Sequence, residues 1–253
     1  MDKSELVFRK PLMNAAGMLG YAPDVHAGLN SFPNGNWEDL GAFVTNPLSL
    51  RPRQPASAPG VLEFAGGALL HTGLPNPGFW GALKKYARRW AVTALPVIVH
   101  LMADGLDETA GMVRALEGLE NIAAIELGFA PQQAADFILR LVEVARGELP
   151  LIANLPFEQA LSLGPRVIKG GAAALSFAPP HGVLPGTAGP EPLLISGRLY
   201  GPALFPQALN LLSGLVRLGV PVIGGVGVFG PEQARTMLGC GALAVQLDTL
   251  LWQ

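Results

Sequence analysis

A glycine-rich segment near the C-terminus, GGVGVFG at 224–230, has the spacing of a phosphate-binding loop. Its glycines follow an apolar run and precede a helix signal, as in the G-x-G-x-x-G fingerprint, and Asp248 lies 23 residues beyond Gly225. Because the sequence ends at Gln253, we do not expect the remainder of a Rossmann domain. Two interpretations stay open, namely the phosphate site of a barrel and a simple tight turn between a strand and a helix.

Polar side chains interrupt four apolar runs that we interpret as strands. His100 and Glu126 end the third and fourth strands, Asn154 ends the fifth, and Gln246 lies in the eighth. A buried polar group needs a hydrogen-bond partner or a ligand, so a structural role and a ligand-binding role both remain open. His100 and Glu126 are our candidates for proton transfer. The histidines lack metal-ligand spacing, so we expect no metal site.

Short apolar runs that alternate with amphipathic helices must position these residues. Near-continuous Val, Ile, Leu and Ala runs are typical of parallel strands covered on both faces. We predict eight such strands, at Leu12–Ala15, Ala42–Thr45, Val97–Leu101, Ala123–Leu127, Leu151–Asn154, Ala173–Phe177, Val220–Gly224 and Ala242–Leu247. The pattern favours a single (β/α)₈ barrel over residues 1–253, with a doubly wound open sheet as the alternative.

Helices fit between the predicted strands, several of them opening with proline. We predict them at Phe79–Trp90, Asp107–Leu119, Pro131–Glu148, Pro156–Lys169, Pro202–Leu218 and Pro231–Leu238. Two long connections, Asn46–Pro77 and Ala178–Gly201, follow strand ends and are expected to be loops that bind or cover a ligand.

Composition narrows the class of protein. Half of the 253 residues are hydrophobic and 14% are charged, which is enough apolar surface for a large core. A net charge of −2 gives no global attraction to nucleic acid or to an anionic membrane. The single cysteine, Cys240, excludes an intramolecular disulfide, and neither a secretory signal nor a membrane span is apparent. We therefore expect a cytoplasmic protein with no nucleic-acid or membrane partner.

Several motifs, in order along the whole chain, resemble the soluble, FMN-dependent branch of the dihydroorotate dehydrogenase family. They include MNAAGMLGY at 13–21, GAFVTNPLSLRPR at 41–53, GLPNPG at 73–78 and the block VPVIGGVGVFGPEQARTMLGCGALAVQLDT at 220–249. The resemblance implies a barrel that binds FMN above the carboxyl ends of its strands and oxidises dihydroorotate in pyrimidine biosynthesis. It implies cofactor contacts at Ala16, Gly17, Asn46, Asn154, Gly197, Gly224, Gly225 and Thr249.

The residues that depart from the family pattern lie at positions that the family uses for catalysis and for binding its cofactor and substrate. Ala130 stands at the position of the catalytic base, and a methyl group cannot accept a proton. Asn46 and Asn154 replace two lysines near the flavin, and Asp248 replaces a glycine at the phosphate, so all three argue against FMN. The asparagines of the substrate site are lost as well, being replaced by Leu70, Gly128, Gln132 and Phe177, with Ala178 beside them.

Three hypotheses follow from these departures. The chain is a diverged member that is non-catalytic or acts on another small-molecule ligand, or an active FMN-dependent oxidoreductase, or an accessory subunit. Only LLWQ follows Thr249, so we expect the final outer helix of the barrel to be missing. The apolar surface left uncovered would favour a homo-oligomer or a partner subunit.

Overall fold

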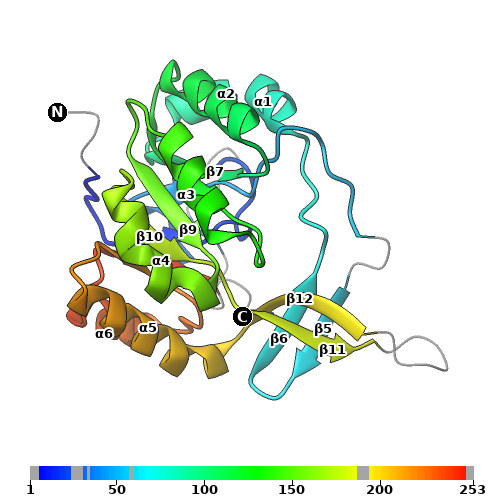
Figure 1. Ribbon diagram of the computed structural model, residues 1–253, viewed down its shortest axis with the longest axis vertical. Helices are drawn as coiled ribbons and strands as arrows, with labels where there is room; N and C mark the ends of the chain where they lie inside the picture. Colours follow the sequence, from blue (N-terminus) through cyan, green and yellow to red (C-terminus); the bar gives the residue numbers. More distant parts are fainter. Residues whose placement is uncertain (1–5, 24–30, 33–34, 57–59, 187–193, 249–253) are drawn as a thin grey trace.

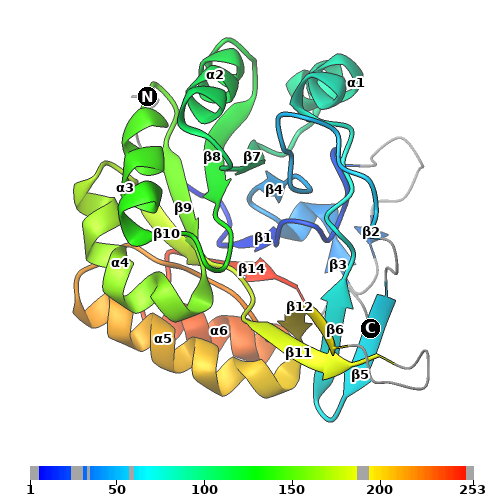
Figure 2. The same ribbon diagram turned by 45° about the vertical axis from the view of Figure 1, so that its right-hand side comes forward.

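Eight parallel strands form a closed ring at the centre of the molecule (Figures 1 and 2). The computed structural model describes residues 6–23, 31–32, 35–56, 60–186 and 194–248. Hydrogen bonds join five strands in the order β10-β9-β8-β7-β4 and three in the order β1-β14-β13. Parallel bridges Met13–Ala42 and Leu175–Val222 connect the two sets at both ends. This closure confirms the expectation of a barrel over the open-sheet alternative.

The strands of the ring lie where the apolar runs predict them, although some are shorter. Their bounds are β1 Leu12–Asn14, β4 Phe43–Val44, β7 Val97–Met102, β8 Ile122–Gly128, β9 Leu151–Leu155, β10 Ala174–Phe177, β13 Ile223–Gly224 and β14 Ala244–Leu247.

Helices surround the ring on its outer side, as Figure 2 shows. They are α1 Phe79–Val92, α2 Leu106–Glu117, α3 Ala135–Val144, α4 Phe157–Lys169, α5 Phe205–Arg217 and α6 Pro231–Gly239, with short 3₁₀ turns η2 at Trp37–Asp39 and η3 at Pro202–Leu204. Two predicted starts are wrong. The predicted Pro202 helix divides into η3 and α5. The predicted Pro131 helix begins only at Ala135, because the Gln133 side chain accepts a hydrogen bond from the Ala130 N–H and stabilises a turn there.

The core has two parts because alternate strand residues face opposite sides of the ring. The outward side chains pack against the helices and form the larger cluster, which includes Leu101, Leu127 and Leu155. The inward side chains form a smaller cluster that fills the barrel: Met13, Ala42, Val44, Ile98, Ala124, Ile152, Ala174, Ile223 and Ala244. These small and branched residues provide a packed floor beneath the carboxyl end of the barrel.

The two long connections form a second sheet instead of the loops expected for them. Its strands are β5 Gly60–Phe64, β6 Gly67–His71, β11 His181–Pro185 and β12 Leu194–Tyr200, antiparallel in the order β11-β12-β6-β5. Pairing of β6 with β12 joins segments that are far apart in the sequence, which local patterns cannot reveal. Figures 1 and 2 show this sheet projecting from one side of the barrel. A further hairpin pairs β2 Ser31–Phe32 with β3 Gly35–Asn36.

Some expectations concern residues outside the described ranges. They are the missing helix after Thr249 and the proposed cofactor contact of Thr249 itself. Within the described ranges, none of the helices combines the length and apolarity needed to cross a bilayer.

Candidate functional site

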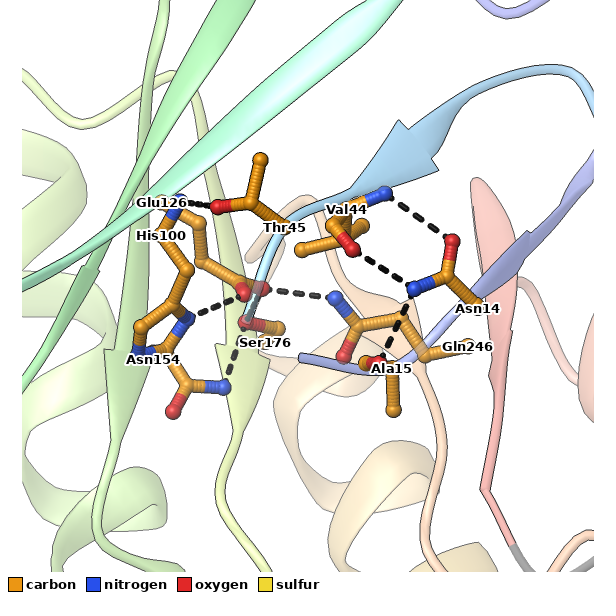
Figure 3. A network of polar contacts seen from close by, with 9 residues as sticks. All are labelled: Asn14, Ala15, Val44, Thr45, His100, Glu126, Asn154, Ser176 and Gln246. Atoms are coloured by element: carbon orange, nitrogen blue, oxygen red, sulfur yellow. Dashed lines mark hydrogen bonds and ion pairs between the residues drawn. The ribbon is translucent and has the colours of Figure 1, made fainter. Parts of the chain in front are cut away.

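A layer of polar side chains lies directly above the apolar floor of the barrel. On each of four strands the inward position two residues beyond the floor is polar, which gives the pairs Ile98 and His100, Ala124 and Glu126, Ile152 and Asn154, and Ala174 and Ser176. On β14 the same step leads from Ala244 to Gln246. Since inward positions recur every second residue, the five polar side chains meet at one level, as Figure 3 shows.

Glu126 is the centre of this polar network. Its Oε2 lies 2.7 Å from His100 Nδ1, and its Oε1 accepts hydrogen bonds from Ser176 Oγ at 2.7 Å and Gln246 Nε2 at 2.6 Å. Asn154 Nδ2 extends the network by donating to Ser176 Oγ at 2.9 Å. Burial by itself would raise the pKa of Glu126, but the hydrogen bond and charge of His100, with the other two donors, outweigh it and hold that pKa below its ordinary value. Glu126 is therefore a carboxylate at neutral pH.

This carboxylate fixes the orientation of the His100 ring. Because Glu126 is an acceptor, Nδ1 carries a hydrogen, and Nε2 is the ring nitrogen that faces away from this carboxylate. None of the described residues forms a hydrogen bond with Nε2. The ring fits only because position 128 is glycine, since a Cβ there would lie 2.3 Å from Nε2. The pair has the geometry of a base held in place by a carboxylate.

A cavity of about 350 Å³ opens above His100, between the barrel and the second sheet. His100, Gly128 and Ala130 come from the barrel, and β6 and β12 supply the opposite wall. Polar and charged groups around it are Arg53, His71, Asp104, His181, Ser196 and Arg198. Two guanidinium groups face one carboxylate, so the cavity has an excess of positive charge.

Burial and neighbouring charges shift two groups in the cavity wall. Burial, together with the nearby charge of Arg198, lowers the pKa of His181, while Glu158 opposes the shift. Burial raises the pKa of Asp104, Arg53 opposes this and Glu108 adds to it. His181 is consequently neutral at pH 7, and the guanidinium groups of Arg53 and Arg198 are the permanent cations of the cavity.

A second, much smaller pocket of about 20 Å³ lies beside the glycine-rich turn that follows β13. Its lining includes Asn154, Arg198, Tyr200, Val226 and Asp248. This volume has room for about one water molecule. The Asp248 side chain is 1% exposed, and its Oδ2 accepts a hydrogen bond from the backbone N–H of Gly227 at 3.2 Å.

Comparison with known proteins identifies the family to which this chain belongs. The "Dihydroorotate dehydrogenase B (NAD(+)), catalytic subunit" of Maridesulfovibrio salexigens is 30% identical over 98% of this chain and 86% of its own length. The chain belongs to the dihydroorotate dehydrogenase family. The protein of the same name from Geotalea daltonii is 29% identical, over 98% of this chain and 86% of its own length. No protein-family model matches the chain.

The fold of the family is found in solved structures as well. Dihydroorotate dehydrogenase (DHODH) from Eimeria tenella, in complex with ferulenol, superimposes with a TM-score of 0.72 over 99% of this chain and 79% of the other. At 14% identity this likeness concerns the fold alone. It agrees with the closed ring of parallel strands.

The positions assigned by family resemblance divide into two groups. Ala16, Gly17 and Gly197 line the large cavity, together with Ala130 at the family's base position, and Asn154 lines the small pocket. In contrast, three of these positions line neither the large cavity nor the small pocket, and their contacts are structural. Asn46 accepts a hydrogen bond from the Gly20 N–H at 3.1 Å, a Cβ on Gly224 would meet Met237 at 2.8 Å, and one on Gly225 would lie 3.4 Å from Gln246.

Sequence reasoning missed several residues of the candidate site and of the barrel around it. Ser176 has a detectable signal, because it is the single polar residue within the apolar run of β10. Arg198 and Tyr200 lie in one of the connections expected to be loops, and only the pairing of β12 with β6 brings them over the barrel. Asn14 also escaped notice, although its side chain bonds both the N–H and the C=O of Val44 and so joins β1 to β4.

Proposed function

We propose that this chain is a diverged dihydroorotate-dehydrogenase-type barrel that has lost FMN-dependent oxidation of dihydroorotate and instead binds a small organic anion. The proposal rests on the position and size of the two pockets at the carboxyl end of the barrel. The cavity of about 350 Å³ is cationic and lies over His100, whereas about 20 Å³ remains beside the glycine-rich turn.

The residues beside this turn do not fit the phosphate of FMN. A phosphate at such a turn needs free backbone N–H groups and space for its oxygens. The Gly227 N–H is already bonded to Asp248, and the pocket holds about one water molecule. A dianionic phosphate would also be repelled by the Asp248 carboxylate. These contacts support the loss of the flavin.

The family's position for the catalytic base supports the same conclusion. Ala130 lines the cavity, but its methyl group can neither accept nor donate a proton. A group in the same cavity that can do so is the ring of His100, held by Glu126 through Nδ1 at 2.7 Å. It comes from β7, whereas Ala130 follows β8, so any proton transfer would take place at a different point of the cavity.

An anion is the ligand class that the cavity walls favour. Arg53 and Arg198 are always protonated, and guanidinium groups suit carboxylates because they donate two parallel hydrogen bonds. The volume is at the low end of the range for small-molecule sites. We therefore assign to the cavity a small carboxylate-bearing molecule, oriented by arginine and placed above His100.

A flavin test decides between this proposal and the active oxidoreductase. We expect the purified protein to be colourless and to show no thermal shift with added FMN. A yellow protein with a flavin absorbance spectrum, or oxidation of dihydroorotate by the FMN-loaded protein, would overturn the proposed loss and support the active enzyme of pyrimidine biosynthesis.

A titration with known carboxylates tests the anion site. Calorimetry with succinate and with orotate, without flavin, should give binding by at least one of them. Replacement of Arg198 by Gln should weaken this binding about tenfold or more, as expected for a charge-assisted contact. Arg166→Gln is the matched control, because Arg166 pairs with the exposed Asp136 instead of facing the cavity. Equal affinities of the two variants would refute the role of Arg198.

The name of the two relatives supports a second proposal, namely that this chain has a partner subunit. Proteins named catalytic subunits belong to assemblies by definition, and two such relatives match nearly the whole of this chain. We propose that this chain likewise associates with another subunit or with a second copy of itself. Light scattering over a wide concentration range tests this, and a monomer throughout, with no co-purifying chain, would count against it.

A further inference from the structure

The turn after β13 has an unusual backbone, with two successive left-handed residues. Val226 and Gly227 are both left-handed, with φ of 67° and 74°, and Gly230 then caps the start of α6. A left-handed conformation is strained for a β-branched residue such as Val226, so the surrounding contacts must hold it in place. Successive N–H groups in such turns commonly form a concave anion site, and the amino end of a helix adds positive potential.

The anion at this turn belongs to the chain itself. Asp248 directly follows β14, two residues beyond Gln246, and its carboxylate accepts a hydrogen bond from the Gly227 N–H at 3.2 Å. Arg198 and Tyr200 line the same small pocket, and a hydrogen bond joins these two side chains. The buried carboxylate thus accepts a hydrogen bond from the backbone and shares its pocket with Arg198, Tyr200 and Val226.

We propose that Asp248 acts as a built-in substitute for a phosphate group, closing the anion site of this turn from within. A carboxylate matches the negative charge that the N–H groups attract, and it needs no space beyond its own strand. It also gives the strained turn a permanent partner, so the turn keeps its shape without a ligand. The inference deepens the proposed loss of FMN by naming the group that fills the phosphate position.

Removal of this side chain should uncover a latent site for a free phosphate. Asp248→Gly deletes both the charge and the bulk, which leaves the Gly227 N–H and Arg198 available. Asp248→Asn deletes the charge and keeps the bulk. Asp136→Asn is the charge-matched control, because Asp136 is 92% exposed at the start of α3. Inorganic phosphate is the probe, so that the result does not depend on the binding of a flavin ring.

The readout is the backbone amide resonance of Gly227 during a phosphate titration, combined with calorimetry. In Asp248→Gly the resonance should move with phosphate, and the affinity should exceed that of the unaltered protein about 10- to 100-fold, the range of one charge-assisted hydrogen bond. In the unaltered protein and in Asp136→Asn it should not respond. If Asp248→Gly does not fold, Asp248→Ala carries the test, because it also removes the carboxylate, and its affinity should still exceed that of Asp136→Asn. Asp248→Asn keeps the bulk and an acceptor for the Gly227 N–H, so it should bind phosphate less well than Asp248→Gly or Asp248→Ala.

Two results would overturn the inference. One is a response of the unaltered protein as strong as that of Asp248→Gly, because the site would then not be closed. The other is a folded Asp248→Gly protein, or Asp248→Ala if the Gly variant does not fold, that binds phosphate no better than Asp136→Asn. Failure here with a colourless unaltered protein would leave the proposed loss of FMN standing, so the two conclusions are tested separately.

Discussion

Single atoms decide the chemistry that this barrel can offer. Nε2 of His100 faces away from Glu126 because that carboxylate holds Nδ1, and the absence of a Cβ at Gly128 gives the ring its space. A carboxylate and a histidine from adjacent strands thereby form a base and the group that orients it. The same five-residue network satisfies every polar atom of Glu126, which is why a buried charge is tolerated.

Gly128→Ala should displace the His100 ring. The added methyl group would lie 2.3 Å from Nε2 and 2.9 Å from Cε1, so the ring must move and its bond to Glu126 must lengthen or break. We expect a loss of about 1–3 kcal/mol in the free energy of unfolding, measured by urea denaturation. Gly111→Ala in α2 is the control, since nothing lies within 4 Å of its added Cβ, and it should be neutral or slightly stabilising. Similar losses in both variants would refute the steric explanation.

Glu126 should make the protein sensitive to acid. Its folded-state pKa lies below the ordinary value of 4.5, so the unfolded chain binds a proton first as pH falls. The stability that this carboxylate contributes is fully present above about pH 5 and is lost as pH falls from 4.5 through the folded-state pKa. Urea denaturation at a series of pH values should show a shallower acid decline for Glu126→Gln than for the unaltered protein. Parallel curves would contradict this assignment.

At the scale of elements, the second sheet turns an open barrel end into an enclosed cavity. Strands β6 and β12 carry Leu70, Ser196 and Arg198 over the ring, and their close pairing requires small residues at the seam. Gly67 is such a residue, because a Cβ there would lie 2.1 Å from the carbonyl oxygen of Tyr200. The sheet is therefore fixed by backbone proximity as well as by hydrogen bonds.

Gly67→Ala should separate β6 from β12 while the barrel stays folded. We expect faster amide hydrogen exchange in β12 and weaker anion binding, because the wall that carries Arg198 moves. Exchange in β7 and β8 should not change, since these strands lie in the ring. Gly60→Ala is the control in the same sheet, as its added Cβ meets nothing within 4 Å. Unaltered exchange in β12 would show that the seam tolerates a side chain.

At the scale of the whole molecule, the ring is weakest where its two strand sets meet. Between β1 and β4 the backbone forms a single bridge, Met13–Ala42, and the Asn14 side chain adds two bonds to Val44, at 3.0 Å to its N–H and 2.6 Å to its C=O. A buried asparagine thus takes the place of a missing stretch of strand pairing. Closure of the barrel depends on this one side chain more than on the local β-propensity.

Asn14→Ala should weaken the whole barrel. It leaves the N–H and C=O of Val44 without these partners in a buried place, and we expect a loss of about 2–4 kcal/mol in the free energy of unfolding. Urea denaturation followed by circular dichroism measures this loss. Asn36→Ala provides the comparison, because Asn36 is exposed and, among the described residues, its side chain makes a long contact with Asp39 at 3.5 Å; it should change stability by less than about 0.5 kcal/mol. A loss for Asn14→Ala no larger than that of Asn36→Ala would contradict the closing role.

The sequence by itself determined the order of the ring strands and of the helices between them, the barrel and the family. Runs such as Val97–Leu101 and Leu151–Asn154 are apolar on both faces, and a strand covered on both faces has to be apolar wherever it lies. It also marked His100, Glu126 and Asn154 as polar residues within such runs. The helix starts were less reliable, because a side-chain contact such as that of Gln133 with Ala130 competes with helix formation.

Only the tertiary structure decided which of these residues act together. Whether Glu126 pairs with His100, and whether Asp248 turns inward to Gly227, depends on strand register around a closed ring. The cavity wall joins His71 to Ser196, which are 125 positions apart in the sequence. Such contacts are non-local, and their geometry follows from how the elements pack rather than from the preferences of neighbouring residues.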